Sequence, residues 1–489
     1  MKVYKVQPNI IIIILDTARA QSFSCYGHKR ETTPNIDKIA QEGTLFENTI
    51  SPSPWTLPAH ASIFTGMYPS RHCCHEKHKF LNRNLPTLPE ILMNIGYRTI
   101  GISNNSWISK NFGFDNGFDT FIKLWQIIQY ETDLADASAK GKDKYKKAMG
   151  LVIKGNPFIN IANGVYGKYF WRRYDYGARR INRIVGKLLH DELTKSRTPF
   201  FIFINYLEPH LIYRAPEPFF GMFLAKTISK KDALSVNQDA WGYMGEIVPM
   251  TKTDFEVLRA LYDAELFYLD YRIGEVYELL KETALLDNTL LIITSDHGEN
   301  IGEHNLMDHQ YSLYDTLLKV PLIMRFPGIF EGGKRIGNIV QTTDIVPTIM
   351  ELLSLQDQRL LGRVQGESLL KNGNKRFAVS EYIAPQPPIE VISKRYPAGN
   401  FSKYDESLTS IRSHEWKLIV SSDNKDELYN ILEDPAETKN LWNIHKDIYK
   451  DMRSKIDFWI RENRKDVEDE DTHVATEIKK RLEALGYFT

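Results

Sequence analysis

The sequence predicts an α/β protein with a doubly wound, mostly parallel sheet between helices and a smaller C-terminal α+β subdomain. Unbroken apolar runs at residues 9–15, 199–206 and 289–294 indicate central strands that are buried on both faces. Stretches with helical periodicity lie between these runs, as expected where strands and helices alternate. Towards the C-terminus the long apolar runs stop, and short strands and polar helices follow. We therefore expect one domain over residues 1–375 and a second over residues 376–489.

Composition and charge are those of an ordinary globular protein. The 489 residues carry equal numbers of acidic and basic side chains, so the overall charge does not suggest a nucleic-acid partner. Three cysteines, Cys25, Cys73 and Cys74, form no disulfide framework, and reduced thiols favour a cytoplasmic protein. The apolar run 10–15 is too short for a signal-peptide core or a membrane span, so we expect no transmembrane segment. The sequence leaves open whether the chain forms a homo-oligomer.

The first predicted strand, residues 9–15, ends directly in Asp16. Ligands of doubly wound sheets bind at the carboxyl ends of the strands. Asp16 is therefore either a ligand of a metal or substrate, or the cap of the next helix. The elements expected after it are helices at 34–43 and 85–95 and strands at 45–49 and 97–103.

A proline-rich loop leads into a predicted helical turn at residues 54–66. Thr56 is placed as the N-cap, Pro58 fits the first turn, and Gly66 fits the left-handed stop. The Thr56 hydroxyl would then lie at a helix N-terminus, where free N–H groups and the helix dipole favour anions. An ordinary capped surface helix explains the same pattern, so this stretch alone leaves both interpretations open.

Two segments interrupt the alternation of strands and helices. The first, about residues 130–195, has thirteen Lys or Arg and two acidic residues between Lys140 and Lys187, with aromatic residues interleaved. We interpret it as a solvated helical insertion whose long stems cover apolar surface, with binding of phosphates, anionic lipid or polyanions as the alternative. The second, about residues 211–250, is irregular and rich in Pro and Gly, and we interpret it as a lid-like insertion.

The densest group of metal-ligating residue types follows the strand at 289–294. Asp296, His297, His304, Asp308 and His309 lie within fourteen residues. Aspartate with neutral imidazole suits Zn²⁺ or Mn²⁺ better than Ca²⁺, which prefers oxygen ligands. This stretch therefore predicts a metal or catalytic site at the same edge as Asp16. Another histidine, His210, also follows a buried strand, the run at 199–206.

These motifs, taken in order, resemble the sulfatase branch of the alkaline phosphatase superfamily. The resemblance covers nearly the whole chain apart from the two insertions and rests on the segments 15–19, 33–37, 64–66, 96–99, 295–299, 302–304, 320–323, 427–430 and 434–435. It implies a divalent metal at the carboxyl edge of the sheet, bound by Asp16, Asp296 and His297. It also implies that Thr56 is both a metal ligand and the nucleophile.

The sequence departs from the sulfatase pattern around the predicted nucleophile. Sulfatases have Cys or Ser at the position of Thr56 and oxidise it to formylglycine, whereas the methyl group of Thr prevents formation of an aldehyde. The usual Arg four residues later is His60, and the usual second Asp is Thr17. The usual Gly-Lys-Trp-His segment is replaced by residues 102–105, which include Asn104 and contain no Lys or His. We therefore expect no formylglycine at Thr56.

A second branch of the superfamily matches these departures better. Phosphoethanolamine and phosphoglycerol transferases, and many phosphodiesterases, use an unmodified Thr as nucleophile. In those transferases a histidine twelve residues after the Asp-His pair contacts the substrate or a second metal, and His309 is twelve residues after His297. His210 resembles a further histidine of that site.

The sequence thus predicts a metal-dependent hydrolase, or transferase, of phosphoesters or phosphodiesters that acts through a covalent Thr56 ester. Zn²⁺ or Mn²⁺ is favoured over Ca²⁺, and the substrate would be an anionic ester such as a small molecule, lipid headgroup or glycan. His309 or His210 would stabilise or protonate the leaving oxygen, and His60 would orient Thr56. Weaker candidates for substrate contact are Arg19, Asn104 and His304. Two alternatives remain open: a sulfuric ester hydrolase, and an inactive protein that binds anions.

Overall fold

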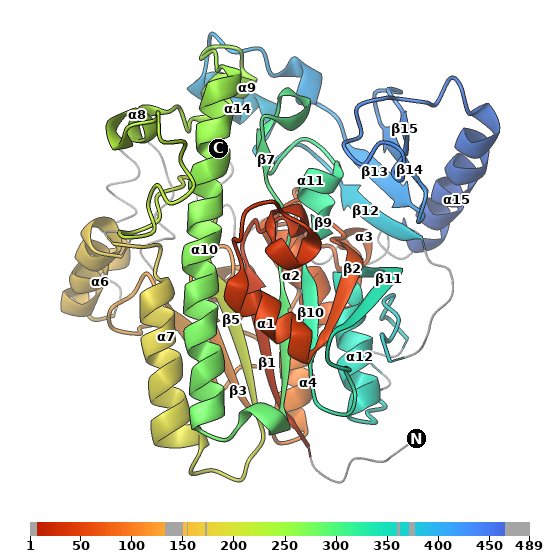
Figure 1. Cartoon of the computed structure of the whole chain (residues 1–489). Helices are drawn as coiled ribbons and strands as arrows, with labels where there is room; N and C mark the ends of the chain where they lie inside the picture. Colours follow the sequence, from red (N-terminus) through yellow and green to blue (C-terminus); the bar gives the residue numbers. More distant parts are fainter. Residues whose placement is uncertain are drawn as a thin grey trace.

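The computed structural model describes residues 7–132, 150–153, 155–171, 174–357, 359, 362–370 and 377–464. A nine-stranded, mostly parallel sheet lies between helices, and a separate four-stranded antiparallel sheet stands at one side (Figure 1). The predicted fold class is therefore confirmed.

The three predicted buried runs form adjacent strands at the centre of the large sheet. The strand order is β11 (Lys334–Gln341), β2 (Thr44–Ile50), β10 (Leu322–Arg325), β6 (Thr289–Thr294), β1 (Asn9–Leu15), β5 (Phe200–Tyr206), β3 (Arg98–Ser103) and β4 (Thr120–Lys123), with β9 (Lys319–Val320) paired to β2. Strand β1 runs parallel to both β5 and β6, and all residues of these three strands are buried. Their carboxyl ends consequently meet at one edge, where the residues that follow them are brought together.

Helices cover both faces of the large sheet, because alternate residues of β1 point to opposite sides. One face packs against α1 (Pro34–Glu42), α7 (Ala178–Lys187) and most of α10 (Lys252–Glu282). The other packs against α2 (Thr56–Thr65), α4 (Leu88–Asn94) and α12 (Ile345–Leu352). Within the described ranges, no helix is both long and apolar enough to cross a membrane.

The structure differs from the sequence prediction at the edges of the sheet. Strands β4 and β11 were not predicted. Neither has an unbroken apolar run, and β11 has a register shift between Ile336 and Ile339. The helix at 56–65 also begins one position earlier than predicted: Trp55, and not Thr56, is its N-cap, and Thr56 is its first residue.

The basic insertion contributes α6 (Pro157–Tyr169) and α7 to one flank of the molecule (Figure 1). Helix α7 buries Ile181 and Val185 in the core beside α10 and exposes Arg179 and Arg183. This helix has the solvated, amphipathic character that the sequence predicts. Residues 133–149, 154 and 172–173 of the insertion lie outside the described residues.

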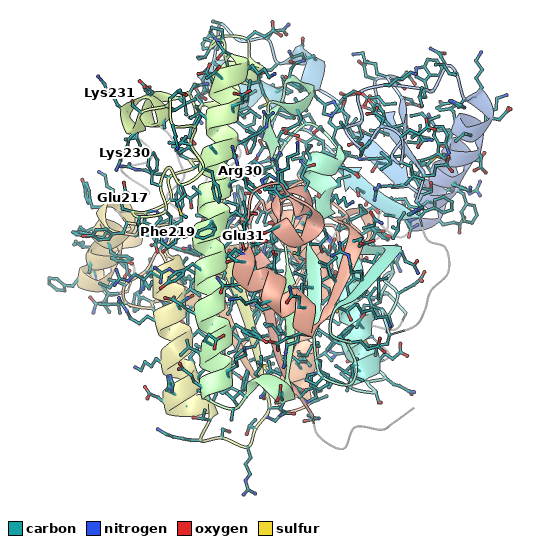
Figure 2. The ribbon with its side chains drawn as sticks, viewed as in Figure 1. Arg30, Glu31, Glu217, Phe219, Lys230 and Lys231 are labelled. Atoms are coloured by element: carbon teal, nitrogen blue, oxygen red, sulfur yellow. The ribbon has the colours of Figure 1, made fainter. Side chains whose placement is uncertain are left out.

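The segment 211–250 contains two short helices, α8 (Lys230–Ser235) and α9 (Ala240–Met244). Figure 2 shows Phe219 beside the long helix α10, and its ring contacts those of Phe267, Tyr268 and Tyr271. Lys230 of α8 pairs with Glu217 of the same segment. The segment is therefore packed on the outer side of α10, and its function as a lid stays a prediction.

The C-terminal subdomain consists of an antiparallel sheet with one long helix on it. The strands, in spatial order, are β12 (Ala378–Tyr382), β13 (Leu408–Arg412), β14 (Trp416–Ser421) and β15 (Glu427–Asn430). Helix α15 (Lys446–Arg464) packs Met452 and Ile456 against Leu418 and Leu428. The predicted boundary at residues 375–376, and residues 465–489 of the predicted subdomain, lie outside the described residues.

A buried ion-pair network joins this subdomain to the main domain. Lys417 Nζ, from β14, lies 2.8 Å from Asp315 Oδ1 and 2.7 Å from Glu437 Oε1. Arg412 Nη2 lies 3.1 Å from Asp315 Oδ2. Asp315 starts the short helix α11 (Asp315–Leu318) of the main domain. Burial alone would raise the pKa of Asp315, but Arg412 and Lys417 outweigh it and lower that pKa to about 2.

We expect Lys417→Met to lower the free energy of unfolding at pH 7 by about 3–5 kcal/mol, because it removes the cation that pairs with the buried Glu437 and leaves Asp315 with Arg412 alone. Since the pKa of Asp315 is lowered from 3.8 to about 2, its stabilising effect is present above pH 3.8 and is lost as the pH falls towards 2. The difference between wild type and variant should therefore shrink in acid. Urea denaturation across this pH range measures both effects.

Lys403→Met is the matched control. Lys403 and Glu246 form an exposed pair at 2.6 Å, and exposed pairs contribute little, so the urea midpoint should stay unchanged. If Lys417→Met unfolds at the same urea concentration as wild type, the network does not stabilise the junction.

Candidate active site

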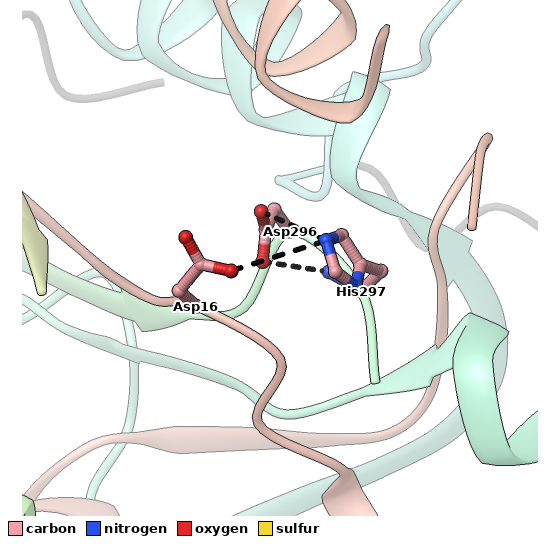
Figure 3. A group of neighbouring side chains, drawn as sticks. All are labelled: Asp16, Asp296 and His297. Atoms are coloured by element: carbon pink, nitrogen blue, oxygen red, sulfur yellow. Dashed lines mark hydrogen bonds and ion pairs between the residues drawn. The ribbon is translucent and has the colours of Figure 1, made fainter. Parts of the chain in front are cut away.

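Four predicted site residues meet at the carboxyl edge of the central strands. Asp16 follows β1, Asp296 and His297 follow β6, and Thr56 begins α2. His297 Nε2 lies 3.3 Å from Asp296 Oδ2, 4.0 Å from Asp16 Oδ1 and 3.3 Å from Thr56 Oγ1. Figure 3 shows the two carboxylates and the imidazole directed towards one another. All four side chains are buried.

The hydrogen bonds of His297 define its tautomer. Its Nδ1 lies 2.9 Å from the carbonyl oxygen of Gly298 and must donate a proton to it. Burial lowers the pKa of His297 well below its ordinary value, so the ring is neutral. Nε2 then carries a lone pair that faces the carboxyl oxygens of Asp16 and Asp296.

Within this group of four residues, two buried carboxylate oxygens, Asp16 Oδ1 and Asp296 Oδ2, have no hydrogen-bond partner among the described residues. Their companion oxygens are bonded, because Asn105 Nδ2 donates to Asp16 Oδ2 at 2.6 Å and the His297 N–H donates to Asp296 Oδ1 at 2.9 Å. Burial, and next the Asp16 carboxylate, raises the pKa of Asp296 well above its ordinary value. An unpaired buried carboxylate is costly, and this donor set of two carboxylates and one imidazole fits a divalent cation.

His60 holds the first turn of α2 against this group. Its Nδ1 lies 2.9 Å from the Thr56 carbonyl oxygen and 3.4 Å from Asp296 Oδ2, and the Asn205 side-chain amide lies 3.4 Å from its Nε2. Burial lowers the pKa of His60 to about 4, so it is neutral. These contacts position the backbone of Thr56 and do not reach its hydroxyl.

A second polar group adjoins the first. His309 Nδ1 lies 2.6 Å from Asp308 Oδ1 and 3.3 Å from Glu299 Oε1. Burial alone would lower the pKa of His309, but the two carboxylates outweigh it and raise that pKa well above its ordinary value. The His309 ring lies 4.6 Å from the ring of His297 and 5.0 Å from that of His210, measured between centroids. The group can therefore hold a proton on His309, or a second cation in its place.

The sequence identified His309 but gave no role to Glu299 or Asp308, although both lie in the stretch that it singled out. The available signal for Asp308 was its place directly before His309, which allows a carboxylate–imidazole pair. Glu299 lies ten residues before His309, and the sequence offered no such signal for it. Glu299 Oε2 is buried and has no hydrogen-bond partner in the described part of the chain.

Two predicted substrate contacts have protein partners of their own. Arg19 Nη1 donates to Glu303 Oε1 at 3.0 Å, and its guanidinium lies 5.2 Å from the ring centre of Tyr262. The His304 ring stacks on Tyr314 with 3.6 Å between centroids. Arg19 Nη1 also donates to the backbone carbonyl oxygen of Glu299 at 3.4 Å, so Arg19 adjoins the second polar group. Contact of Arg19 and His304 with substrate stays a prediction.

Asn104 and its neighbour Asn105 point to different partners. Asn104 accepts a hydrogen bond from Trp171 Nε1 at 2.8 Å and donates to the carbonyl oxygen of Tyr176, so it anchors the basic insertion. Asn105, which the sequence analysis did not select, donates to Asp16. The residue next to the predicted one therefore supports the site.

Comparisons with known proteins identify the family of the chain. The family model described as Sulfatase matches residues 8–355, and one described as N-sulphoglucosamine sulphohydrolase, C-terminal, matches residues 302–465. The first match spans the strands and helices that position Asp16, Thr56 and Asp296.

Relatives match over nearly the whole chain. The uncharacterized sulfatase YidJ of Escherichia coli (strain K12) is 25% identical over 457 residues, covering 92% of this chain and 86% of that protein. The N-acetylglucosamine-6-O-sulfatase of Bacteroides thetaiotaomicron is 26% identical over 513 residues, covering 95% and 88%. The structure of the phosphonate monoester hydrolase of Agrobacterium radiobacter matches with a TM-score of 0.67 at 20% identity, covering 93% and 96%. The chain belongs to the sulfatase family of the alkaline phosphatase superfamily and is a sulfatase-family hydrolase.

Proposed function

We propose that the protein is a metal-dependent hydrolase, or transferase, of phosphoesters or phosphodiesters that acts through a covalent ester on Thr56. The observation that carries this proposal is the Thr56 hydroxyl, 3.3 Å from His297 Nε2 and beside two buried carboxylates with unpartnered oxygens. A threonine cannot form the aldehyde that an ordinary sulfatase uses, but its hydroxyl is a competent nucleophile once it is activated.

In this proposal the site binds a cation through its acidic and imidazole side chains and an anionic ester at the start of α2. A divalent cation held by Asp16, Asp296 and His297 would supply positive charge that lowers the pKa of the Thr56 hydroxyl and offsets the charge of the ester oxygens. Imidazole with carboxylates favours Zn²⁺ or Mn²⁺ as that cation. Thr56 is also the first residue of α2, where free N–H groups favour an anionic ester.

In the first step the Thr56 hydroxyl releases its proton to solvent, and Thr56 Oγ forms a bond to phosphorus while the bond to the leaving oxygen breaks. His309 gives that oxygen a proton, and Asp308 and Glu299 hold the imidazole in place for the transfer. In the second step water, or an acceptor hydroxyl, attacks the phosphothreonine and returns a proton to His309, while the bond from phosphorus to Thr56 Oγ breaks. Thr56 Oγ then takes up a proton from solvent, which restores the hydroxyl. His60 positions Thr56, and His210, beside the His309 ring, stabilises the leaving group.

A sulfuric ester hydrolase is the second candidate. Its support is the set of curated relatives, which includes an N-acetylglucosamine-6-O-sulfatase 26% identical to this chain. Thr56 at the nucleophile position argues against it.

The two candidates separate in a direct comparison of substrates. With Mn²⁺ or Zn²⁺ added, we expect kcat/KM for bis(p-nitrophenyl) phosphate to exceed that for p-nitrophenyl sulfate by about tenfold or more, equivalent to at least about 1.4 kcal/mol of transition-state binding. A preference for the aryl sulfate would establish the second candidate instead. No turnover of either substrate, together with no metal binding by the purified protein, would identify an inactive protein that binds anions.

We also propose that the protein works in the cytoplasm. Its three cysteines are free thiols, and Cys74 is buried. Free thiols are usual in proteins of reducing compartments.

A further inference from the structure

Helix α6 of the basic insertion presents an apolar stripe to the outside. Phe158 is 82% exposed, Ile161 50%, Val165 46% and Tyr169 60%. Their spacing of three and four residues places them on one face of the helix. Figure 1 shows α6 on the flank of the molecule, away from the sheet.

The inner side of the same helix is polar, so its amphipathic pattern is inverted. Asn160 and Asn163 are buried. Asn160 Nδ2 donates to the carbonyl oxygens of Leu151 and Val152 at 3.1 Å, and Asn163 Nδ2 donates to that of Ile128 at 2.8 Å. Rotating the helix to bury its apolar stripe would break these bonds, so the stripe is held outward.

Other exposed apolar side chains extend the stripe. Ile128, whose backbone is bonded to Asn163, is exposed, as are its neighbour Ile127 and Ile153. Monomeric proteins rarely expose apolar patches of this kind unless the patch binds something.

The charge of the insertion identifies the partner. Between Lys140 and Lys187 there are thirteen Lys or Arg against two acidic residues. In the described part, Arg179, Arg183 and Lys187 of the adjoining helix α7 are exposed. A helix with an apolar, aromatic face beside many cations has the composition that binds the surface of anionic membranes. We propose that α6 docks on the surface of an anionic lipid bilayer, with its stripe in the headgroup region.

The docking surface is fixed to the edge of the sheet that carries the candidate active site. Trp171, two residues after α6, donates through Nε1 to Asn104 at 2.8 Å. Asn105, the next residue, donates to Asp16. Docking through α6 would therefore bring the active-site edge close to the membrane. Whether this closeness to the membrane matters for catalysis rests on the proposed function. The docking of α6 on the membrane does not depend on that function.

Vesicle flotation tests the proposal. We expect the full-length protein to float with vesicles of phosphatidylcholine mixed with phosphatidylglycerol, and much less with phosphatidylcholine alone. Raising the salt from about 0.1 M to about 1 M should weaken binding, because screening shortens the reach of the charges. The double variant Phe158→Asp/Ile161→Asp should bind at least about tenfold less, because it removes two apolar side chains from the interface.

The matched control is Ile444→Asp, which changes an exposed isoleucine of the C-terminal subdomain and should bind as wild type. All variants should keep wild-type turnover of soluble bis(p-nitrophenyl) phosphate and an unchanged circular dichroism spectrum. If the wild type does not hydrolyse this substrate at all, that result counts against the proposed function and not against docking. Failure of the wild type to float, or equal floating of the double variant, would overturn the proposal. A wild-type dimer that the double variant converts to a monomer would also overturn it and would make this face an interface between two copies.

Discussion

Thr56→Ala is expected to lower kcat for bis(p-nitrophenyl) phosphate by at least about a thousandfold, the scale of loss seen when a nucleophile is removed. The variant should still bind metal, because Asp16, Asp296 and His297 remain. Its fold should persist, since the Thr56 hydroxyl has, among the described residues, only the 3.3 Å contact with His297 Nε2 and is not the cap of α2. Steady-state kinetics and metal analysis of the same sample measure both results.

Two further variants make this result specific. Thr56→Ser keeps the hydroxyl and should keep measurable turnover. Thr65→Ala removes the same side chain at the other end of α2, where its hydroxyl donates to the Ala61 carbonyl oxygen, and should leave kcat unchanged. Intact mass after an acid quench should show a phosphoryl adduct on wild type that Thr56→Ala lacks. Wild-type activity in Thr56→Ala would remove this residue from the mechanism.

The part of the site that could be predicted from sequence is the part fixed by parallel strands. Strands β1 and β6 are unbroken apolar runs, so their position in the sheet followed from composition and the meeting of Asp16 with Asp296 followed from topology. Strands β4 and β11 lie at the edges, where exposed positions interrupt the apolar run, and the same reasoning missed them.

Side-chain direction could not be predicted. Asn104 and Asn105 follow the end of β3, and neighbouring residues of an extended chain point to opposite sides. Sequence alone could not tell which one faced Asp16, and the structure places Asn105 there. His304 has a positive φ of 53° that no spacing rule indicates, and its ring stacks on Tyr314.

The inverted helix α6 shows a related limit. The periodicity of Phe158, Ile161 and Val165 predicts an apolar stripe, but it does not say whether the stripe faces the core or the solvent. The orientation depends on hydrogen bonds made by Asn160 and Asn163 to loop carbonyl oxygens. Those partners are known only when the fold is known.

Asp296→Asn is expected to abolish metal binding and to lower kcat by at least about a thousandfold, because it removes one of the carboxylates proposed to hold the cation. Wild type treated with a chelator should lose activity to a similar extent and recover it when Mn²⁺ or Zn²⁺ is added, whereas the variant should not recover. Metal content after dialysis and kinetics with and without added metal measure these effects.

The urea concentration at which each protein unfolds distinguishes loss of metal binding in Asp296→Asn from misfolding of the variant. Without metal, Asp296 Oδ2 is buried without a hydrogen-bond partner among the described residues and lies in a cluster with Asp16, so the folded wild type bears the cost of two adjacent buried carboxylates. The neutral amide removes one charge, so Asp296→Asn should unfold at a higher urea concentration than chelator-treated wild type at pH 7. With metal added, the order should reverse, because only the wild type gains binding energy in its folded state. A variant that is less stable than wild type in both conditions would show that Asp296 serves the fold and not a cation.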